Sequence, residues 1–148
     1  MYRHLLLPTD GSPLSVHAIE QGLELAASLG ARVTILTVVE PFYSFVAEPE
    51  HFGETRDRYE KHARQAAHAI LDSAMDKARA KGVEAEMKLI GSEHPDQAII
   101  STATSLGCDL IAMASHGRRG VNALLLGSVT QKVLTHSSLP VLVLRPTG

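Results

Sequence analysis

Short apolar runs alternate with longer amphipathic segments along the whole chain of 148 residues. The short runs are rich in Leu, Val and Ile and show no polar alternation, which is typical of strands buried on both faces of a parallel sheet. The longer segments place apolar residues three and four positions apart, as helices do. We therefore predict five strands, each separated from the next by one helix, at residues 3–8, 32–39, 85–90, 109–114 and 141–145.

The predicted helices have recognisable beginnings and ends. Ser12 and Pro13 supply an N-cap and a first-turn proline for the first helix, and Gly30 follows its last turn. Three further helices are expected at about 55–81, 95–106 and 128–136, and the first two of these are ended by Gly82 and Gly107. The inward face of the second helix is predicted to comprise Tyr59, Ala63, Ala66, Ile70, Ala74 and Ala78.

This order of elements predicts a single α/β domain over residues 1–148, a five-stranded parallel sheet with helices on both faces. Ligands of such sheets bind beyond the carboxyl ends of the strands, where the strand order reverses. Two polar loops follow strands there, PTDGS at 8–12 and ASHG at 114–117. If the first and fourth strands are neighbours, Asp10 faces the second loop across one crevice.

The segment after the fourth strand has the features of a phosphate-binding site. Gly127 and Ser128 lead into the last predicted helix. The first N–H groups of a helix lack intrahelical partners and carry the positive end of its dipole, and glycine lets a ligand approach the backbone. Ser128 and Gln131 also match a capping box, in which the serine would use those N–H groups itself. Both roles remain open for Ser128.

Charge is unevenly distributed along the chain. Net charge is −2, but residues 110–148 contain no acid and four bases, Arg118, Arg119, Lys132 and Arg145, so that this end carries +4. A weakly acidic protein is a poor general nucleic-acid binder, whereas a locally basic end attracts a compact anion. The alternative is a chance cluster of solvated cations, and we expect at least one of Arg118 and Arg119 to be solvated.

The single cysteine, Cys108, excludes an internal disulfide, and its place beside an apolar strand predicts a small buried residue. The three leucines before Pro8 are too few for a signal segment or a membrane span. We therefore expect a cytoplasmic protein that makes no contact with membranes.

The connection over residues 40–54 is long and unusually aromatic for this chain. Its rings are those of Phe42, Tyr43, Phe45 and Phe52. They indicate either a lid over the crevice or a cover for one end of the sheet or for a partner chain.

Several enzyme and cofactor motifs are missing. The chain has no G-x-x-x-x-G-K-[ST] P-loop, no G-x-G-x-x-G after the first strand, no H-E-x-x-H and no G-x-S-x-G. Ordinary P-loop NTPases and dinucleotide dehydrogenases are therefore disfavoured, and the eight histidines suggest no metal site. No nucleophile and base stand at a suggestive spacing, which argues against an enzyme.

Gly117, the nine residues after it, and Gly127 with Ser128 form a spaced glycine pattern. Together with LLLPTDGS, LLLGSVTQKVL and SLPVLVLRP, this pattern resembles the universal stress protein family over essentially the whole chain, in particular its ATP-binding branch. The pattern of that branch is glycine, two residues, glycine, nine residues, glycine and Ser or Thr, and Gly117 supplies its second glycine. Ala114 stands at the first glycine position. A left-handed backbone there would cost about 1–2 kcal/mol, but we expect an extended one, because Ala114 continues a strand.

The resemblance implies a Rossmann-like fold of the adenine nucleotide alpha hydrolase-like type, with ATP and Mg²⁺ in the crevice. Asp10 would meet the phosphates through Mg²⁺, or it caps the first helix or its turn. His116 would donate to phosphate, or it shapes the loop. The expected nucleotide-binding residues are Pro8, Thr9, Asp10, Val38, Met113, Ala114, His116, Gly117, Gly127, Ser128, Val129 and Thr130.

The resemblance also implies a homodimer. The apolar strand Val141–Leu144 should lie at the sheet edge, where it would pair with its counterpart. The expected function is that of a cytoplasmic stress-response protein that acts as a nucleotide-dependent sensor or regulator. The alternatives are a nucleotide-independent dimeric interaction module of the same fold and a slow ATP hydrolase.

Overall fold

The structure is a computed structural model that describes residues 1–41, 53–117 and 125–146. The four aromatic residues of the 40–54 connection lie outside the described residues, as do Arg118 and Arg119. Neither the lid prediction nor the solvation of the two arginines is therefore tested.

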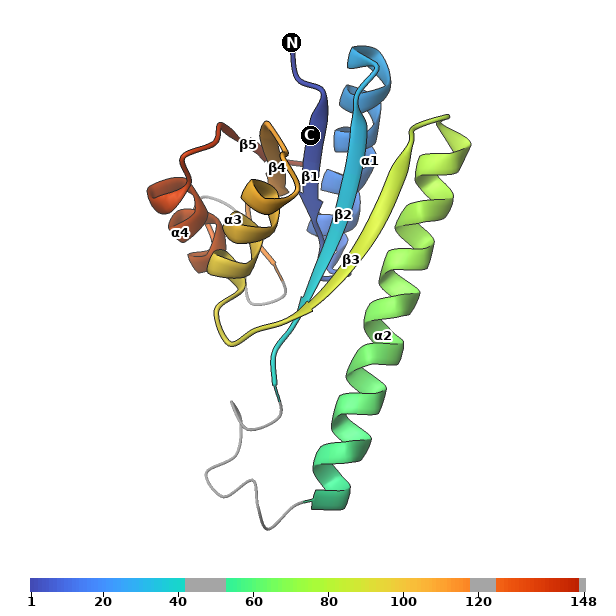
Figure 1. The fold of residues 1–148 in the computed structure, drawn as a ribbon, viewed down its shortest axis with the longest axis vertical. Coiled ribbons are helices and arrows are strands. Elements are labelled where there is room, and N and C mark those ends of the chain that lie inside the picture. Colours follow the sequence, from blue (N-terminus) through green and yellow to red (C-terminus); the bar gives the residue numbers. More distant parts are fainter. Residues whose placement is uncertain (42–52, 118–124, 147–148) are drawn as a thin grey trace.

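Strands and helices alternate in the predicted order (Figure 1). The strands are β1 (His4–Pro8), β2 (Arg32–Val39), β3 (Ala85–Gly91), β4 (Leu110–Ala114) and β5 (Val141–Leu144). The helices are α1 (Pro13–Leu29), α2 (Gly53–Ala80), α3 (Pro95–Ser105) and α4 (Ser128–His136). Within the described ranges, no helix combines the length and the hydropathy that a membrane crossing requires.

The five strands form one parallel sheet in the order β3-β2-β1-β4-β5. The chain builds outward from β1 to β3 and then returns to the other side of β1 to add β4 and β5. The strand order therefore reverses between β1 and β4, where Leu5 pairs with Leu110 and Leu6 with Ile111. β5 lies at the edge of the sheet, as predicted.

Helices cover both faces of the sheet, which confirms the predicted fold class. α1 and α2 lie on one face, and α3 and α4 lie on the other (Figure 1). Because side chains alternate along a strand, Leu5 and Leu7 of β1 join the core under α1 and α2, whereas Leu6 joins the core under α3 and α4. All three are at most 1 % exposed. Burial on both faces explains the uninterrupted apolar runs of the sequence.

The first helix begins and ends where the sequence predicts. The Ser12 hydroxyl caps α1 by accepting from the Ser15 N–H at 3.3 Å, and Pro13 occupies the first turn. Gly30 ends the helix with φ of 66°, a left-handed conformation that favours glycine.

The predicted inward face of α2 is partly wrong. Ala74 and Ala78 are buried as expected, but Ala66 is exposed, and Ala67 and Leu71 take its place in the core. Successive steps of four residues drift by about 40° around a helix, so a stripe counted from the first turns leaves the core face. Those first turns extend past the carboxyl end of the sheet (Figure 1), where the core no longer fixes which face is inward.

The amino-terminal end of the sheet is joined by polar contacts, of which the one between His4 and Thr34 is buried. The Asp109 carboxylate accepts from the backbone N–H groups of Arg3 at 2.9 Å and His4 at 3.0 Å, tying β1 to the start of β4. The His4 Nε2 atom lies 2.7 Å from the Thr34 hydroxyl, which donates to Glu86 at 3.0 Å. Because the Thr34 proton is committed to Glu86, His4 must donate from Nε2. Burial, with Arg32 nearby, lowers the pKa of His4.

Cys108 is buried at the same end of the sheet, as predicted. Burial, reinforced by the neighbouring Asp109 carboxylate, raises the pKa of its thiol to about 11. The side chain is therefore a neutral thiol packed against the core at physiological pH.

Candidate functional site

A cleft of about 530 Å³ opens at the carboxyl ends of β1, β2 and β4. It lies at the point where the strand order reverses, between the first turns of α3 and α4 and the amino-terminal half of α2. The structure brings together all twelve residues predicted to bind nucleotide. Those lining the cleft include Pro8, Thr9, Asp10, Val38, Met113, Ala114, His116, Gly117, Gly127, Ser128, Val129 and Thr130.

The loop after β1 is held in shape by its own hydrogen bonds. The Thr9 N–H donates to the Leu36 carbonyl at 2.8 Å, which extends the pairing with β2 by one residue. The Thr9 hydroxyl lies 3.0 Å from the Ser15 hydroxyl and accepts from the Gly11 N–H at 3.2 Å. Gly11 turns the chain with φ of 80°. The loop is therefore fixed by the sheet and by α1 before any ligand is considered.

Asp10 projects from this loop toward the second one. Its Oδ1 atom accepts from the Ser12 N–H at 3.0 Å, so the carboxylate does close the turn at the start of α1. Its Oδ2 atom faces Gly117: a Cβ built on Gly117 would lie only 2.5 Å from it. The two loops meet at this pair, and any side chain at position 117 would displace the carboxylate.

Gly127 packs directly on the backbone of the loop after β4. Its N–H donates to the Ser115 carbonyl at 2.7 Å. A Cβ at position 127 would lie 3.3 Å from both the Ser115 oxygen and the His116 Cα, tighter than ordinary contact. Its φ is −66°, so glycine is needed here for space and not for an unusual backbone conformation.

The predicted capping box at the start of α4 does not form. The N-cap residue is Gly127 and not Ser128, and as a glycine it has no side chain with which to cap the helix. The Gln131 amide donates instead to the Leu126 carbonyl at 2.9 Å. Ser128 therefore lies within the first turn, and no side chain of the described residues accepts from the first N–H groups of α4. Ser128 is not the N-cap residue that a capping box requires.

Thr130 anchors this helix to β4. Its hydroxyl is buried and donates to the Ala114 carbonyl at 2.9 Å. Ala114 is the last residue of β4, and the described residues include no non-glycine with positive φ. The extended conformation expected for Ala114 is confirmed, so alanine at this position causes no backbone strain.

His116 is buried, and its Nδ1 atom lies 3.1 Å from the Ser115 hydroxyl. This contact supports the loop-shaping role among the two that the sequence left open. His116 also lines the cleft, so its other ring nitrogen is not assigned by that contact.

Comparison with known proteins agrees with this geometry. Residues 1–145 match the model of the universal stress protein family. The chain belongs to that family. Universal stress protein YxiE of Bacillus subtilis is 34 % identical over 98 % of this chain and 100 % of its own length.

Solved structures of the family share the fold of this universal stress protein. The structure of MJ0577 from Methanocaldococcus jannaschii superimposes with a TM-score of 0.83 at 25 % identity, covering 100 % of this chain and 99 % of that one. A universal stress protein in complex with cAMP superimposes with a TM-score of 0.72 at 26 % identity, covering 97 % of each chain. The Rossmann-like fold expected for the family is the fold observed.

Other residues of this universal stress protein line the cleft without having been predicted from its sequence. Lys132 follows the first turn of α4, Tyr59 comes from α2, and Glu93, His94 and Asp96 surround the start of α3. Pro95 marks the start of α3 in the sequence, but nothing in the sequence shows that α3 opens onto the same cleft as α4. That knowledge requires the packing of both helices on one face of the sheet.

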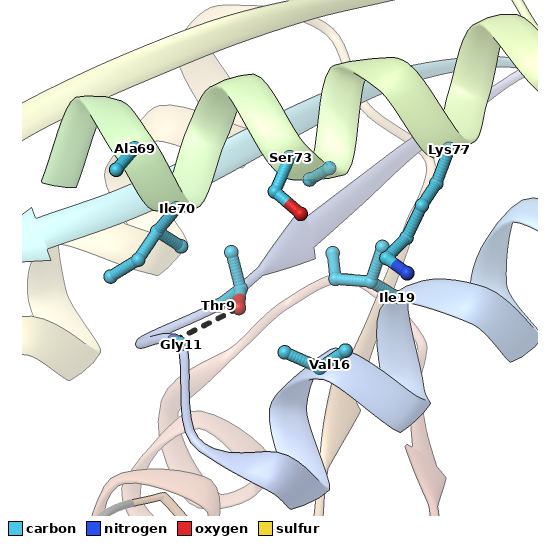
Figure 2. Close-up of a pocket in the computed structure, with 9 residues that line it drawn as sticks. Thr9, Gly11, Val16, Ile19, Ala69, Ile70, Ser73 and Lys77 are labelled. Carbon is cyan, nitrogen blue, oxygen red and sulfur yellow. Dashed lines mark hydrogen bonds between the residues drawn. The ribbon is translucent and has the colours of Figure 1, made fainter.

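A second cavity of about 280 Å³ lies between α1 and α2 and adjoins the cleft through Thr9 and Ile70. Figure 2 shows its mainly apolar lining, with Ser73 and Lys77 of α2 as polar members. The Lys77 ammonium is paired with Glu20 at 3.1 Å. The cavity offers little to fix the orientation of a polar ligand, so the cleft is the candidate functional site of this universal stress protein.

Proposed function

We propose that this universal stress protein binds ATP with Mg²⁺ in the cleft and acts as a nucleotide-dependent sensor or regulator in the stress response. One observation carries the proposal: α4 begins at Gly127, which has no side chain to cap it, no other described side chain accepts from its first N–H groups, and this helix start opens into the cleft. The Ser12 hydroxyl caps α1, whereas α3 also begins without a side-chain cap but carries the Asp96 carboxylate in its first turn. Unpaired N–H groups at a helix start favour an anion, and phosphate is the anion that such sites commonly hold.

The shape of the cleft supports a ligand of nucleotide size. Its volume of about 530 Å³ lies within the usual range for small-molecule sites. Gly117 and Gly127 expose their backbone atoms to the cleft. A Cβ at position 117 would crowd Asp10, and a Cβ at position 127 would crowd the loop after β4. Hydrogen bonds to charged groups contribute roughly 1.5–3 kcal/mol each, so three or four of them support micromolar binding after the cost of association.

The adenosine half would occupy the rest of the cleft. We assign backbone hydrogen bonds with adenine to Val38 at the end of β2, and contacts with the ribose or base to Met113 and Ala114. The relative solved with cAMP holds an adenine nucleotide, which supports adenine as the base.

Mg²⁺ would be held mainly by phosphate oxygens. The described residues contain no cluster of three or more His, Cys, Asp or Glu side chains that could hold a metal alone. Asp10 supplies one carboxylate, and Mg²⁺ is commonly bound by one or two carboxylates together with phosphates and water. When bound, the ion would neutralise phosphate charge beside the Asp10 carboxylate.

We also propose a homodimer through β5. The strand Val141–Leu144 lies at the sheet edge, and Leu142 is 38 % exposed. An exposed apolar edge strand is a template for pairing with another strand, and a second copy of the same strand satisfies a two-fold axis.

The decisive test is to denature the purified protein, identify any released nucleotide, and titrate ATP with Mg²⁺ by calorimetry. Wild type should bind with a micromolar Kd. Gly127→Val should weaken binding at least tenfold, because its side chain enters space occupied by the loop after β4. Gly91→Val is the matched control, since a Cβ there would meet only the Val39 oxygen at 3.9 Å.

Gly91→Val should bind ATP within twofold of wild type and unfold at the same urea concentration. The absence of both a co-purified nucleotide and any affinity tighter than millimolar would reject the proposed function.

A further inference from the structure

Asp96 is a buried carboxylate in the wall of the cleft. It lies in the first turn of α3, directly after Pro95, and is 8 % exposed. Its remaining exposure is toward the cleft, which it lines together with Glu93 and His94. Charged side chains are rarely buried to this extent unless they are paired.

The Asp96 carboxylate has no partner within the described residues. Neither a side-chain hydrogen bond nor an ion pair reaches it, whereas Asp109 accepts two backbone N–H groups and Glu20 holds Lys77. An ionised carboxylate offers acceptors only. Its position in the first turn of α3 gives it a favourable interaction with the helix dipole. A carboxylate on any side of the first turn would interact equally well with the helix dipole. The dipole therefore does not explain why the Asp96 carboxylate faces the cleft.

The two sides of the cleft differ in charge. Neither α3 nor α4 has a side-chain cap from its N-cap residue, so the difference lies in the charged side chains. The α4 side presents Lys132, which favours phosphate, and the α3 side presents Asp96 and Glu93, which repel it. α3 also packs beside the end of β2, where Ile99, one turn after Asp96, shares a core cluster with Val38. A bound nucleotide would therefore place its phosphates toward α4 and its nucleoside beside α3.

We propose that Asp96 is a binding residue for the nucleoside, accepting a hydrogen bond from a ribose hydroxyl or from the amino group of adenine. This inference rests on the proposed nucleotide binding and adds a selective contact to it. The ligand donor supplies the partner that the described residues do not. A site built around a buried acceptor rejects analogues that lack the donor, because the carboxylate is then left unpaired.

The test compares ATP with three analogues that each remove one candidate donor: 2′-deoxy-ATP, 3′-deoxy-ATP and inosine triphosphate. Each is titrated into wild type and into Asp96→Asn and Asp96→Ala. Wild type should bind ATP at least tenfold more tightly than one of the three analogues. Asp96→Ala should lose that preference while keeping measurable ATP affinity, and the analogue concerned identifies the donor. Asp96→Asn keeps an acceptor oxygen and should retain part of the preference.

Glu93→Gln is the matched control, since Glu93 borders the same side of the cleft but is exposed. It removes the same charge and should change all four affinities by a common factor. Such a uniform change in the Asp96 variants would show a general electrostatic effect and overturn the inference. If wild type bound ATP and all three analogues with equal affinity, that result alone would overturn the inference about Asp96. Absence of ATP binding by wild type would instead reject the proposed function, and the inference with it.

Discussion

Replacing Gly117 by alanine tests how the two loops of the cleft pack together. The φ of Gly117 lies outside the left-handed region, so alanine is conformationally allowed. The new Cβ would lie 2.5 Å from Asp10 Oδ2, however, and real Cβ contacts are essentially never shorter than 3.0 Å. The carboxylate must therefore retreat by at least 0.5 Å.

This movement carries Asp10 Oδ1 away from the Ser12 N–H, which it now accepts at 3.0 Å. A hydrogen bond to a charged group contributes roughly 1.5–3 kcal/mol, and partial exposure of Asp10 places this one toward the low end. Gly117 is exposed, so the added methyl gains little from burial. We expect Gly117→Ala to lower the free energy of unfolding by about 1–2 kcal/mol.

Urea unfolding at one protein concentration should be measured for wild type, Gly117→Ala, Asp10→Ala and the double variant. With Asp10 truncated, the methyl meets no carboxylate, and Gly117→Ala should cost less than about 0.5 kcal/mol in that background. Equal costs of Gly117→Ala in the two backgrounds would refute the reasoning, because the effect would then not pass through Asp10.

Three further outcomes are expected. Leu142→Lys should shift the protein from dimer to monomer in size-exclusion chromatography without loss of helical circular dichroism; an unchanged elution volume contradicts the β5 interface. Thr130→Val should lower the free energy of unfolding by about 1–2 kcal/mol, since the Ala114 carbonyl loses a buried donor. Because burial lowers the pKa of His4 below its usual 6.5, the unfolded chain binds the proton first. Stability should be complete above about pH 6.5 and fall below it, with a smaller fall in His4→Gln; an equal fall in both proteins argues against His4.

The sequence was most informative where local chemistry decides the structure. Ser12 and Gly30 bound α1 because capping and left-handed φ are properties of single residues. The apolar runs predicted a doubly covered sheet because alternate residues of β1, such as Leu5 and Leu6, enter different cores. The edge position of β5 came from the family resemblance, since apolar composition alone does not order strands.

The features that the sequence did not predict depend on packing between segments that are distant in the chain. Gln131 is placed like the last residue of a capping box, but Gly127, which packs closely on Ser115, is the N-cap residue in place of Ser128, and Gln131 donates to the Leu126 carbonyl. Positions 66 and 67 are both alanine, so their sequence does not show which one is buried. The position of α2 relative to the end of the sheet decides that Ala67 is buried and Ala66 is exposed. Asp96 resembles an ordinary first-turn acid until α3 is placed beside β2.

The adjacency of β1 and β4 also has a consequence for biosynthesis. His4 and Asp109, which join these strands, are 105 positions apart, so a ribosome delivers the whole of β1 to β3 before the second loop of the cleft exists. Such distant pairings form slowly compared with local ones. A ligand held between the two loops can add its binding free energy only after β1 and β4 have paired. It would therefore stabilise finished molecules and leave nascent or truncated chains unaided.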